Sequence, residues 1–224
     1  MTTTLVFDVN ETMLDLAAMD DQFEQIFGDS AVRREWFALV LRNALTLTIV
    51  GQYSDFVTIA GASLDMVAGV RGLVMSPNQR ALISRQMTEL PPHPDVPESL
   101  KLLKASGLRM AALTNSPPEV ATKQLDNADL SKYFDHILSV HAVERLKPHP
   151  DVYRHAASAI GATLEEMMMV AAHDWDIAGA MAVGTKGAYV LRQGMARNPL
   201  FVEPTVTGDT MTTVAEKILR LTTS

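Results

Sequence analysis

The sequence TLVFDVNET at residues 4–12 determines how the rest of the chain is interpreted. Thr4–Phe7 is a short apolar run typical of a buried parallel strand, and Asp8 follows it directly. Ligands of open α/β sheets bind beyond the carboxyl ends of the strands, so Asp8 lies where chemistry is expected. With the hydroxyl of Thr12 four positions on, it suggests a carboxylate nucleophile held by loop amides. A strand-ending aspartate in an ordinary turn is common, however, and this run alone does not decide the function.

Four more short apolar runs, each bounded by turn residues or charges, are predicted to be buried parallel strands. They are Arg109–Thr114, His136–Val140, Met168–Ala172 and Ala188–Leu191. The helical patterns that alternate with them are Pro97–Ser106, Pro118–Ala128, Asp151–Ile160 and Asp176–Val183, and a last helix is expected over Thr212–Leu221. This alternation predicts the α/β class with a doubly wound parallel sheet.

The stretch from Leu14 to Leu90 has a different pattern, because it is almost wholly helical and contains no convincing strand. The helices expected there are Asp20–Phe27, Ala31–Thr48, Tyr53–Val70 and Asn78–Met87. We predict a helical cap inserted after the first strand, with the chain returning through Pro91-Pro92-His93-Pro94. The expected domains are a core of residues 1–13 and 97–224 and a cap of residues 14–96.

The composition excludes several classes of protein. The chain has no cysteine, which rules out disulfides, thiolate catalysis and Cys-ligated metal sites. Its formal net charge of −7 would repel a phosphate backbone or an anionic membrane, so neither nucleic acid nor a membrane is an expected partner. Residues 1–4 lack the features of a signal peptide, and no apolar stretch approaches the ~20 residues that a bilayer requires. We therefore expect a cytoplasmic protein.

Polar residues also follow the carboxyl ends of other predicted strands. The second strand leads into Thr114-Asn115-Ser116, and the fourth into the segment from Ala172 to Asp176. Lys147 stands just before a predicted helix that contains Tyr153. Because carboxyl ends of parallel strands share one edge of a sheet, these segments and Asp8 are expected to converge on one crevice. Each segment alone is weak evidence for a functional site, but the order and spacing of all the segments together are strong evidence.

The four segments FDxxxT, LTN, KPxxxxY and VAxxxWDxxGA resemble the motifs of the haloacid dehalogenase superfamily. Within it the chain looks most similar to the hydrolytic 2-haloacid dehalogenases, and the resemblance covers essentially the whole sequence. It implies a Rossmann-like core with an inserted helical cap and hydrolysis of short L-2-haloacids to 2-hydroxy acids. The implied substrate is thus a small anion. Neither a cofactor nor a metal is implied, whereas a homodimer is.

The resemblance also implies roles for individual residues. Asp8 would attack the α-carbon of the haloacid and displace halide, leaving an aspartyl ester. Thr12 and Thr114 would hold the nucleophile or the substrate carboxylate, and Lys147 would balance the charge of Asp8. Asn10, two positions after the nucleophile, is placed with the substrate-binding residues.

Four more roles come from the same resemblance. Tyr153 would orient Lys147 or the substrate. Asp176 would position Lys147 and help to activate the hydrolytic water. Asn115 and Trp175 occupy the positions of the family's halide cradle.

Two positions distinguish the chain from the magnesium-dependent phosphatases of the superfamily. Those enzymes need a second aspartate two residues after the nucleophile, where this chain has Asn10. They also need an acidic metal ligand after the fourth strand, where this chain has Ala171-Ala172. A carbon–halogen bond requires neither group. Asp174 leaves the phosphatase alternative open, and a catalytically silent relative that binds a small acid is a third possibility.

Three positions depart from the best-known dehalogenases. Glu11 replaces a glycine, and His173 stands where an asparagine is usual. His173 has the pKa range for a hydrogen-bonding or water-activating role, although a structural histidine is the alternative. The family's halide-binding arginine follows a tryptophan in the cap, but Phe37 follows Trp36 here. Arg42, a lone cation in an apolar stretch, is the nearest candidate; snorkelling to solvent is the alternative.

Overall fold

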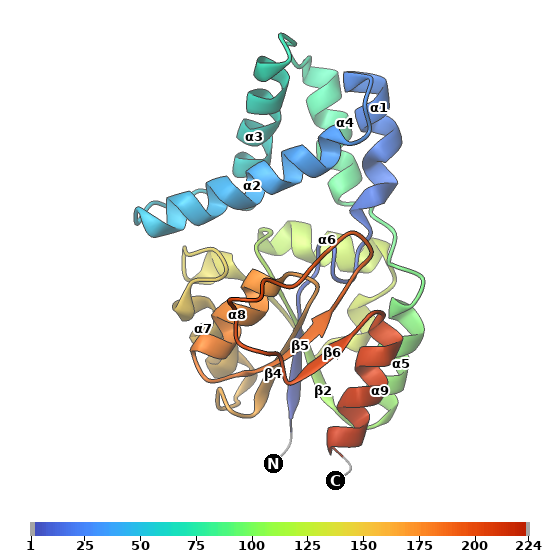
Figure 1. Cartoon of the computed structure of the whole chain (residues 1–224), viewed down its shortest axis with the longest axis vertical. Helices are drawn as coiled ribbons and strands as arrows, with labels where there is room; N and C mark the ends of the chain where they lie inside the picture. The colour runs from blue at the N-terminus through green and yellow to red at the C-terminus, as the bar shows by residue number, and fades with distance from the viewer. Residues whose placement is uncertain (1–2, 223–224) are drawn as a thin grey trace.

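The computed structural model describes residues 3–222, which form a six-stranded parallel sheet in the order β3-β2-β1-β4-β5-β6. The strands are β1 (Thr4–Phe7), β2 (Arg109–Thr114), β3 (His136–Ser139), β4 (Met167–Ala171), β5 (Lys186–Val190) and β6 (Val206–Gly208). β1 pairs with β2 on one side and β4 on the other, so Asp8 leaves the middle of the sheet (Figure 1). The predicted α/β class and doubly wound parallel sheet are confirmed. The edge strand β6 was not predicted, because three residues are too few to show a pattern.

Helices cover both faces of this sheet. They are α5 (Val96–Ala105), α6 (Pro118–Asn127), α7 (Pro150–Ile160), α8 (Asp174–Ala182) and α9 (Met211–Thr222). The connections from β1 to β2 and from β4 to β5 run in opposite directions along the sheet. Because such crossovers are right-handed, α5 and α8 lie on opposite faces. α5 packs against α9, and α7 packs against α8 (Figure 1).

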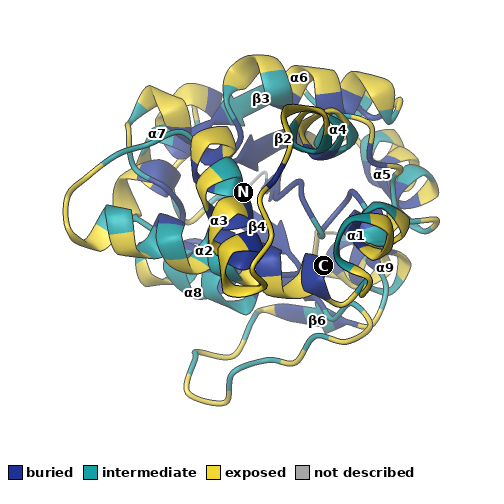
Figure 2. Ribbon diagram, turned by 90° about the horizontal axis from the view of Figure 1, so that it is seen from above, coloured by how far each residue is buried: buried dark blue, intermediate teal, exposed yellow. Residues whose placement is uncertain are grey.

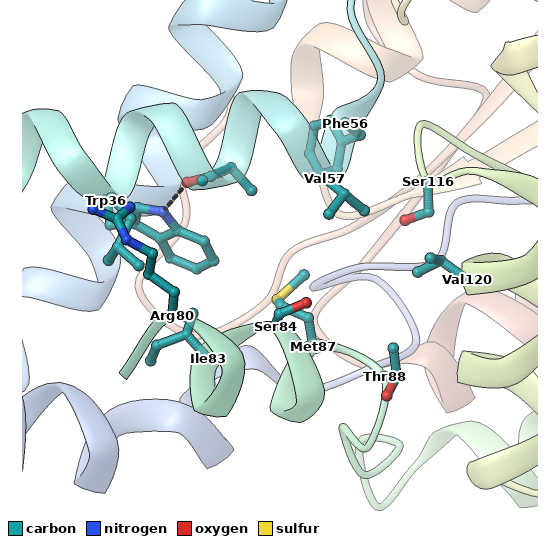
Figure 3. Close-up of a pocket in the computed structure, with 13 residues that line it drawn as sticks. Trp36, Phe56, Val57, Arg80, Ile83, Ser84, Met87, Thr88, Ser116 and Val120 are labelled. Carbon is teal, nitrogen blue, oxygen red and sulfur yellow. Dashed lines mark hydrogen bonds between the residues drawn. The ribbon is translucent and has the colours of Figure 1, made fainter. Parts of the chain in front are cut away.

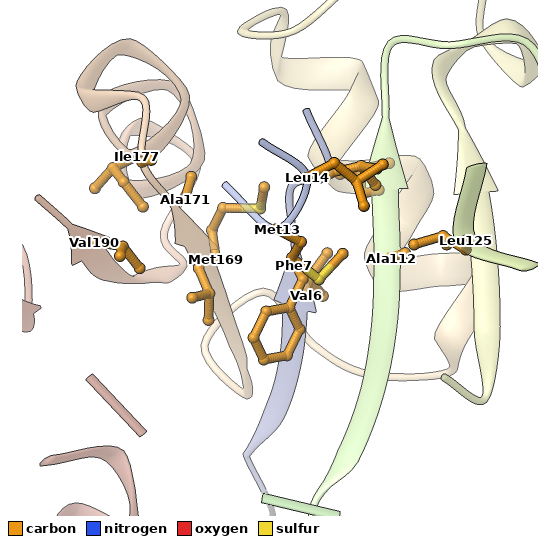
Figure 4. Close-up of a cluster of buried hydrophobic side chains, with 14 of the residues drawn as sticks. Val6, Phe7, Met13, Leu14, Ala112, Leu125, Met169, Ala171, Ile177 and Val190 are labelled. Carbon is orange, nitrogen blue, oxygen red and sulfur yellow. The ribbon is translucent and has the colours of Figure 1, made fainter. Parts of the chain in front are cut away.

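The core is built around β1, whose four residues are all buried. Val6 and Phe7 are neighbours in a strand, so their side chains point to opposite faces of the sheet. Both belong to a buried cluster that also contains Met13, Met169 and Ile177 (Figure 4). Buried strands lie inside a ring of helices whose outer surfaces are exposed (Figure 2). The loops at the carboxyl ends of the strands therefore start from a rigid platform.

Four helices stand above the carboxyl edge of the sheet, and we call them the cap helices (Figure 1). They are α1 (Asp20–Phe27), α2 (Val32–Ile49), α3 (Phe56–Val70) and α4 (Pro77–Met87), and a short 3-10 helix, Leu16–Met19, precedes them. Trp36 of α2 donates its indole N–H to the Ala60 carbonyl of α3 at 2.9 Å, and its ring packs against Phe23 of α1. None of the helices within residues 3–222 is long and apolar enough to cross a membrane.

The chain enters and leaves the cap helices at one place. The Asp15 amide donates to the Pro91 carbonyl at 2.8 Å, and the His93 amide donates to the Met13 carbonyl at 2.9 Å. The two crossings therefore run side by side, next to the loop that carries Asp8. The exact division into a core of residues 1–13 and 97–224 and a cap of residues 14–96 stays a prediction.

Candidate active site

The carboxylate of Asp8 is buried at the end of β1 and contacts three side chains from separate segments. Lys147 Nζ donates to Oδ1 at 2.6 Å, while Oδ2 accepts from Thr12 Oγ1 at 2.7 Å and from His173 Nδ1 at 3.0 Å. Burial alone would raise the pKa of Asp8, but Lys147 and His173 outweigh it and hold that pKa well below its ordinary value. Asp8 is consequently an ionised carboxylate at neutral pH, as a nucleophile must be.

Lys147 connects the ends of several strands. Its Nζ also donates to Asp176 Oδ2 at 2.7 Å and to the Leu113 carbonyl at 3.0 Å. Its backbone amide donates to the side-chain oxygen of Asn115 at 2.9 Å, which fixes the loop in which it lies. Burial would lower the pKa of Lys147, but Asp176 and Asp8 together raise it. The buried ammonium group is therefore retained between two carboxylates.

Asp176 is held in one orientation by Tyr153. The Tyr153 hydroxyl donates to Asp176 Oδ1 at 2.7 Å and to the Asp176 carbonyl at 3.1 Å. Burial raises the pKa of Tyr153 well above its ordinary value, with a contribution from Asp176, so the hydroxyl remains a donor. Burial also raises the pKa of Asp176 although Lys147 opposes the shift. A carboxylate with a raised pKa is a better proton acceptor, which suits the activation of water.

Gly179 of α8 is required by this arrangement. A Cβ atom at Gly179 would lie 2.3 Å from the Pro148 Cβ and 2.9 Å from the Tyr153 hydroxyl. We expect Gly179→Ala to lower the free energy of unfolding by about 1–3 kcal/mol, the usual cost of overpacking. It should also lower kcat/KM by roughly 100-fold, because Lys147 and Tyr153 would shift by an ångström or so.

Urea unfolding and steady-state kinetics on Gly179→Ala would measure both effects. Gly69→Ala is the matched control, since a Cβ at Gly69 of α3 meets nothing within 4 Å. Wild-type kinetics in Gly179→Ala would mean that the close contact does not position the site.

His173 lies between two carboxylates. Its Nδ1 is 3.0 Å from Asp8 Oδ2, and its Nε2 is 3.0 Å from Glu11 Oε2. Its ring packs against Trp175, with centroids 4.9 Å apart, and faces Phe37 at 6.4 Å. Burial would lower the pKa of His173, but Asp8 and Glu11 outweigh it and raise that pKa to about 10. The histidine is therefore an imidazolium at neutral pH.

The loop after Asp8 has an unusual backbone at Glu11, whose φ of 59° lies in the left-handed region. Non-glycine residues pay roughly 1–2 kcal/mol there, so a glutamate needs compensating contacts. The Glu11 carbonyl accepts from His93 Nε2 at 3.0 Å, and its carboxylate meets His173. Thr12 secures the next turn, because its hydroxyl also accepts from the Ala172 amide at 2.9 Å.

Asn10 and Thr114 are engaged within the protein. The Asn10 side chain accepts from Gln124 Nε2 at 3.0 Å and has its nitrogen 3.5 Å from Ser116 Oγ. Thr114 Oγ1 accepts from the Ser116 amide at 3.1 Å. Asn10 therefore links β1 to α6 through its amide, and it has no proton to give to a leaving group. Nothing in the sequence indicated that Gln124 contacts Asn10, because the two residues lie 114 positions apart.

Two cavities adjoin this cluster. The first has a volume of about 200 Å³ and lies between the cap helices and α6, with mostly apolar walls that include Trp36, Phe56 and Met87 (Figure 3). Ser116 lines its core side, and Ser116 contacts Asn10, so this cavity ends close to the loop that follows Asp8. The second, about 270 Å³, is bordered by Glu11 among others. The first is therefore an apolar space between cap and core that reaches the loop after β2 at Ser116.

The structure does not bring Arg42 to the site, which corrects the expectation from the sequence. Arg42 is exposed on α2, its guanidinium lies 3.5 Å from the Asn43 side chain, and it lines neither cavity. Instead Arg33 of the same helix is buried, with Nε 2.5 Å from Asp20 and Nη1 3.9 Å from Glu11. Sequence reasoning missed Arg33 and the Glu11–His173 pair.

The residues present do not fit a magnesium ion of the kind the phosphatases use. Both oxygens of Asp8 already meet cations, namely Lys147 and His173. The Asp174 carboxylate, the one possible displaced ligand, accepts from the Asn198 amide at 2.9 Å. Over residues 3–222, no group of three or more His, Cys, Asp or Glu side chains could hold a metal ion.

Comparison with known proteins agrees with this geometry. The model of the haloacid dehalogenase-like hydrolase family matches residues 2–184. Haloacetate dehalogenase H-2 from Moraxella sp. (strain B) is 26% identical over 216 residues, 96% of each chain. The (S)-2-haloacid dehalogenase H-109 from Pseudomonas putida is 28% identical over 203 residues, 90% of this chain and 91% of the relative.

A solved structure has the same fold over nearly the full length. The L-2-haloacid dehalogenase from Xanthobacter autotrophicus, with chloropropionic acid covalently bound, superposes with a TM-score of 0.91. The match covers 98% of this chain and 99% of that one at 23% identity. The chain belongs to the haloacid dehalogenase-like hydrolases. Within them it is similar to the 2-haloacid dehalogenases, and the resemblance seen in the four motifs is thus confirmed.

Proposed function

We propose that the protein hydrolyses short L-2-haloacids to 2-hydroxy acids through an aspartyl ester. The observation that carries the proposal is the buried Asp8 carboxylate, whose two oxygens contact the Lys147 ammonium group and the His173 ring. The two curated relatives are named for the dehalogenation of haloacetate or (S)-2-haloacids, and the Xanthobacter enzyme holds chloropropionic acid covalently. These names support the same reaction here.

In this proposal Asp8 attacks the α-carbon, and halide leaves with the electron pair of the carbon–halogen bond. Water then attacks Cγ of the ester, with Asp176 as the proton acceptor and Lys147 and Tyr153 as its positioning partners. Thr12 holds the Asp8 carboxylate. The ester bond then breaks between Cγ and the Asp8 oxygen that displaced halide, and that oxygen leaves as part of the hydroxy acid.

The substrate contacts are also part of the proposal. Asn10, Thr114 and Asn115 follow the ends of β1 and β2, and their side chains contact Ser116 or the Lys147 amide. Trp175 flanks His173 and would form one wall for the halide. Arg42 is not retained among these residues, because it is exposed away from the cluster.

The direct test is a halide-release assay with chloro-, bromo- and fluoroacetate and with both isomers of 2-chloropropionate. Turnover of the L-isomer and of at least one haloacetate is expected. Hydrolysis of phosphate esters without any halide release would replace this function by the phosphatase alternative. Failure to turn over either class would favour a catalytically silent relative.

Metal independence is the second expected result. Lys147 and His173 take the places at Asp8 that a divalent ion would need, and Asn10 and Ala172 replace the acid and the ligand of the phosphatases. Halide release should therefore be unchanged by EDTA. A loss of about tenfold or more that magnesium restores would contradict this, since it is the scale of a catalytic metal's contribution.

We further propose that the protein is a cytoplasmic homodimer. The ends of two cap helices expose large apolar side chains, which are Ile49 and Val50 at the end of α2 and Val70 and Val74 at and beyond the end of α3. Such exposed apolar groups are typical of surfaces that bind another protein. A molar mass of one chain in light scattering would exclude the dimer.

A further inference from the structure

A row of alternating charges runs from the nucleophile into the cap. Asp8 Oδ2 contacts His173 Nδ1 and His173 Nε2 contacts Glu11 Oε2, both at 3.0 Å. Glu11 Oε1 lies 3.9 Å from Arg33 Nη1, and Arg33 Nε lies 2.5 Å from Asp20 Oδ1. His173 and Arg33 are both more than nine-tenths buried. The proposed reaction as described so far uses neither Glu11 nor Arg33.

His173 is placed as a donor and not as a base. Each ring nitrogen faces a carboxylate oxygen, so both carry a proton and neither has a lone pair available for water. The Trp175 ring, 4.9 Å away, covers the cation and keeps solvent from it. A water-activating histidine would need one nitrogen free towards the substrate, and this arrangement provides none.

The two oxygens of Asp8 are not equivalent. Among the residues that the structure describes, Oδ1 accepts from Lys147 alone, whereas Oδ2 accepts from both Thr12 and His173. Oδ1 is therefore the freer nucleophile, and Oδ2 stays with its two donors when the ester forms. When water adds to Cγ, the negative charge develops on Oδ2, where preorganised donors stabilise it most.

We propose that Glu11 is a positioning residue that keeps His173 as an imidazolium donor to Oδ2 of Asp8, stabilising the oxyanion formed during hydrolysis of the aspartyl ester. The inference rests on the proposed dehalogenase function. Water adds to Cγ and gives one proton to Asp176. The Cγ–Oδ1 bond then breaks, and the departing oxygen takes that proton. The second proton of the water leaves the new Asp8 carboxyl group for solvent, so Asp8 returns to a carboxylate and His173 remains protonated throughout.

The backbone of Glu11 supports this role. Its φ of 59° favours glycine, and yet the position holds a glutamate whose carboxylate reaches His173. Arg33, on cap helix α2, approaches the other carboxylate oxygen. The unfavourable backbone conformation of Glu11 is thus maintained by its contact with His173, which in turn contacts Asp8. Arg33 of the cap supports the same carboxylate.

The charge of His173 also reduces the repulsion that the surrounding carboxylates exert on an anionic substrate. The groups that face it are Asp8 and Glu11, with Lys147 beyond Asp8 and Arg33 beyond Glu11. With His173 protonated, the three cations His173, Lys147 and Arg33 offset three of the four carboxylates, which are those of Asp8, Glu11, Asp176 and Asp20. Loss of the His173 proton would raise the excess from one negative charge to two, which would repel a haloacid more strongly.

A titration that does not depend on activity tests the first part. In ¹⁵N-histidine spectra, assigned with a His173→Asn variant, His173 should titrate near pH 10 in the wild type. Glu11→Gln removes one of the two carboxylates that raise its pKa, so the titration should move towards neutral pH. Glu35→Gln is the matched control, because it removes a carboxylate from the Glu35–Arg71 pair of the cap without touching the site.

Glu11→Gly provides a second variant, because glycine suits the positive φ and removes the same carboxylate. It should fold normally and give the same shift as Glu11→Gln. A His173 that titrates near its ordinary 6.5 in the wild type, or one unaffected by both variants, would overturn the proposal.

Kinetics test the second part. Ester hydrolysis should slow by roughly 10- to 100-fold in both Glu11 variants above neutral pH, less than the loss of a complete oxyanion donor. The first halide should still be released in a burst, and intact-mass spectra should show the ester accumulating on Asp8. The alkaline fall of kcat should begin at a lower pH than in the wild type.

A kcat that rises as His173 loses its proton would overturn the proposal, since it would make the neutral ring a base. If the wild type releases no halide from any 2-haloacid, the proposed dehalogenase function fails. The spectroscopic titration would still decide whether Glu11 holds His173 as a cation, so the two failures are distinguishable.

Discussion

Replacing Asp8 with asparagine is expected to abolish halide release, with a loss of at least about 10⁴-fold in kcat, as for other nucleophile deletions. An amide cannot supply the lone pair that displaces halide. The variant would also leave Lys147 and His173 without their shared anion, so folding must be checked. Asp21→Asn, at an exposed position of α1, is the control for the same chemical change elsewhere.

Isotope labelling tests the covalent route separately from the variant. A single turnover with excess enzyme in ¹⁸O-water should label the peptide that contains Asp8 and leave the first product unlabelled. This is expected because water attacks Cγ, and the oxygen of the product comes from the carboxylate. Label that appears at once in the hydroxy acid, with an unlabelled peptide, would make Asp8 a general base at most.

Lys147→Met is the second variant with a large expected effect. Lys147 is the cation between Asp8 and Asp176, and all three side chains are buried. Its removal leaves Asp176 without a cationic partner and Asp8 with His173 alone, which should cost about 3–5 kcal/mol of unfolding free energy. Activity should fall together with stability, because Asp8 and Asp176 would no longer be held in place.

The pH dependence of that loss has a definite sign. In the wild type the pKa of Asp8 is depressed, so its stabilising contribution exists above the unfolded-state pKa and is lost as pH falls through the folded one. In Lys147→Met the pKa values of Asp8 and Asp176 should rise, and the variant should gain stability as pH falls from 8 to about 5.

Urea unfolding of the variant at both pH values measures this difference. Lys104→Met, which breaks the exposed pair with Asp135, should change stability by less than about 1 kcal/mol. A Lys147→Met protein as stable as the wild type at pH 8 would contradict the buried ion-pair arrangement.

The residues at the strand ends were predictable because their place in the sheet follows from the order of strands and helices. Asp8 and Asp176 follow short apolar runs, and Lys147 precedes a predicted helix; in an open parallel sheet such positions come to one edge. The structure brings them within hydrogen-bond distance, together with Thr12 and His173. Their roles in catalysis stay proposals.

The buried cation of the cap, Arg33, was not predicted, although the sequence contained a pattern that indicates it. Arg33, Trp36, Phe37 and Val40 recur with helical spacing and are all buried in α2. Arg42 lies nine positions after Arg33, which at 3.6 residues per turn places it about half a turn away, on the opposite face. The helical periodicity of the buried residues was thus a better indicator of the inward-facing arginine than the isolation of Arg42 within an apolar stretch.

Glu11 could not be placed from the sequence, because its contact with His173 depends on a backbone conformation that glutamate rarely adopts. Its neighbours gave no local pattern for a positive φ. The partner on the other side, Arg33, comes from a different layer of the molecule, and no periodicity links the two positions.

The two segments that connect the core to the cap helices lie side by side, which affects how the sequence of such a protein can evolve. The Asp15 amide meets the Pro91 carbonyl at 2.8 Å, so 75 intervening residues begin and end at nearly the same point. A segment with adjacent ends can be exchanged for another, or shortened to a turn, without altering the path of the sheet beneath it. The catalytic strand ends could thus be inherited unchanged while the walls of the apolar cavity are supplied by an interchangeable module.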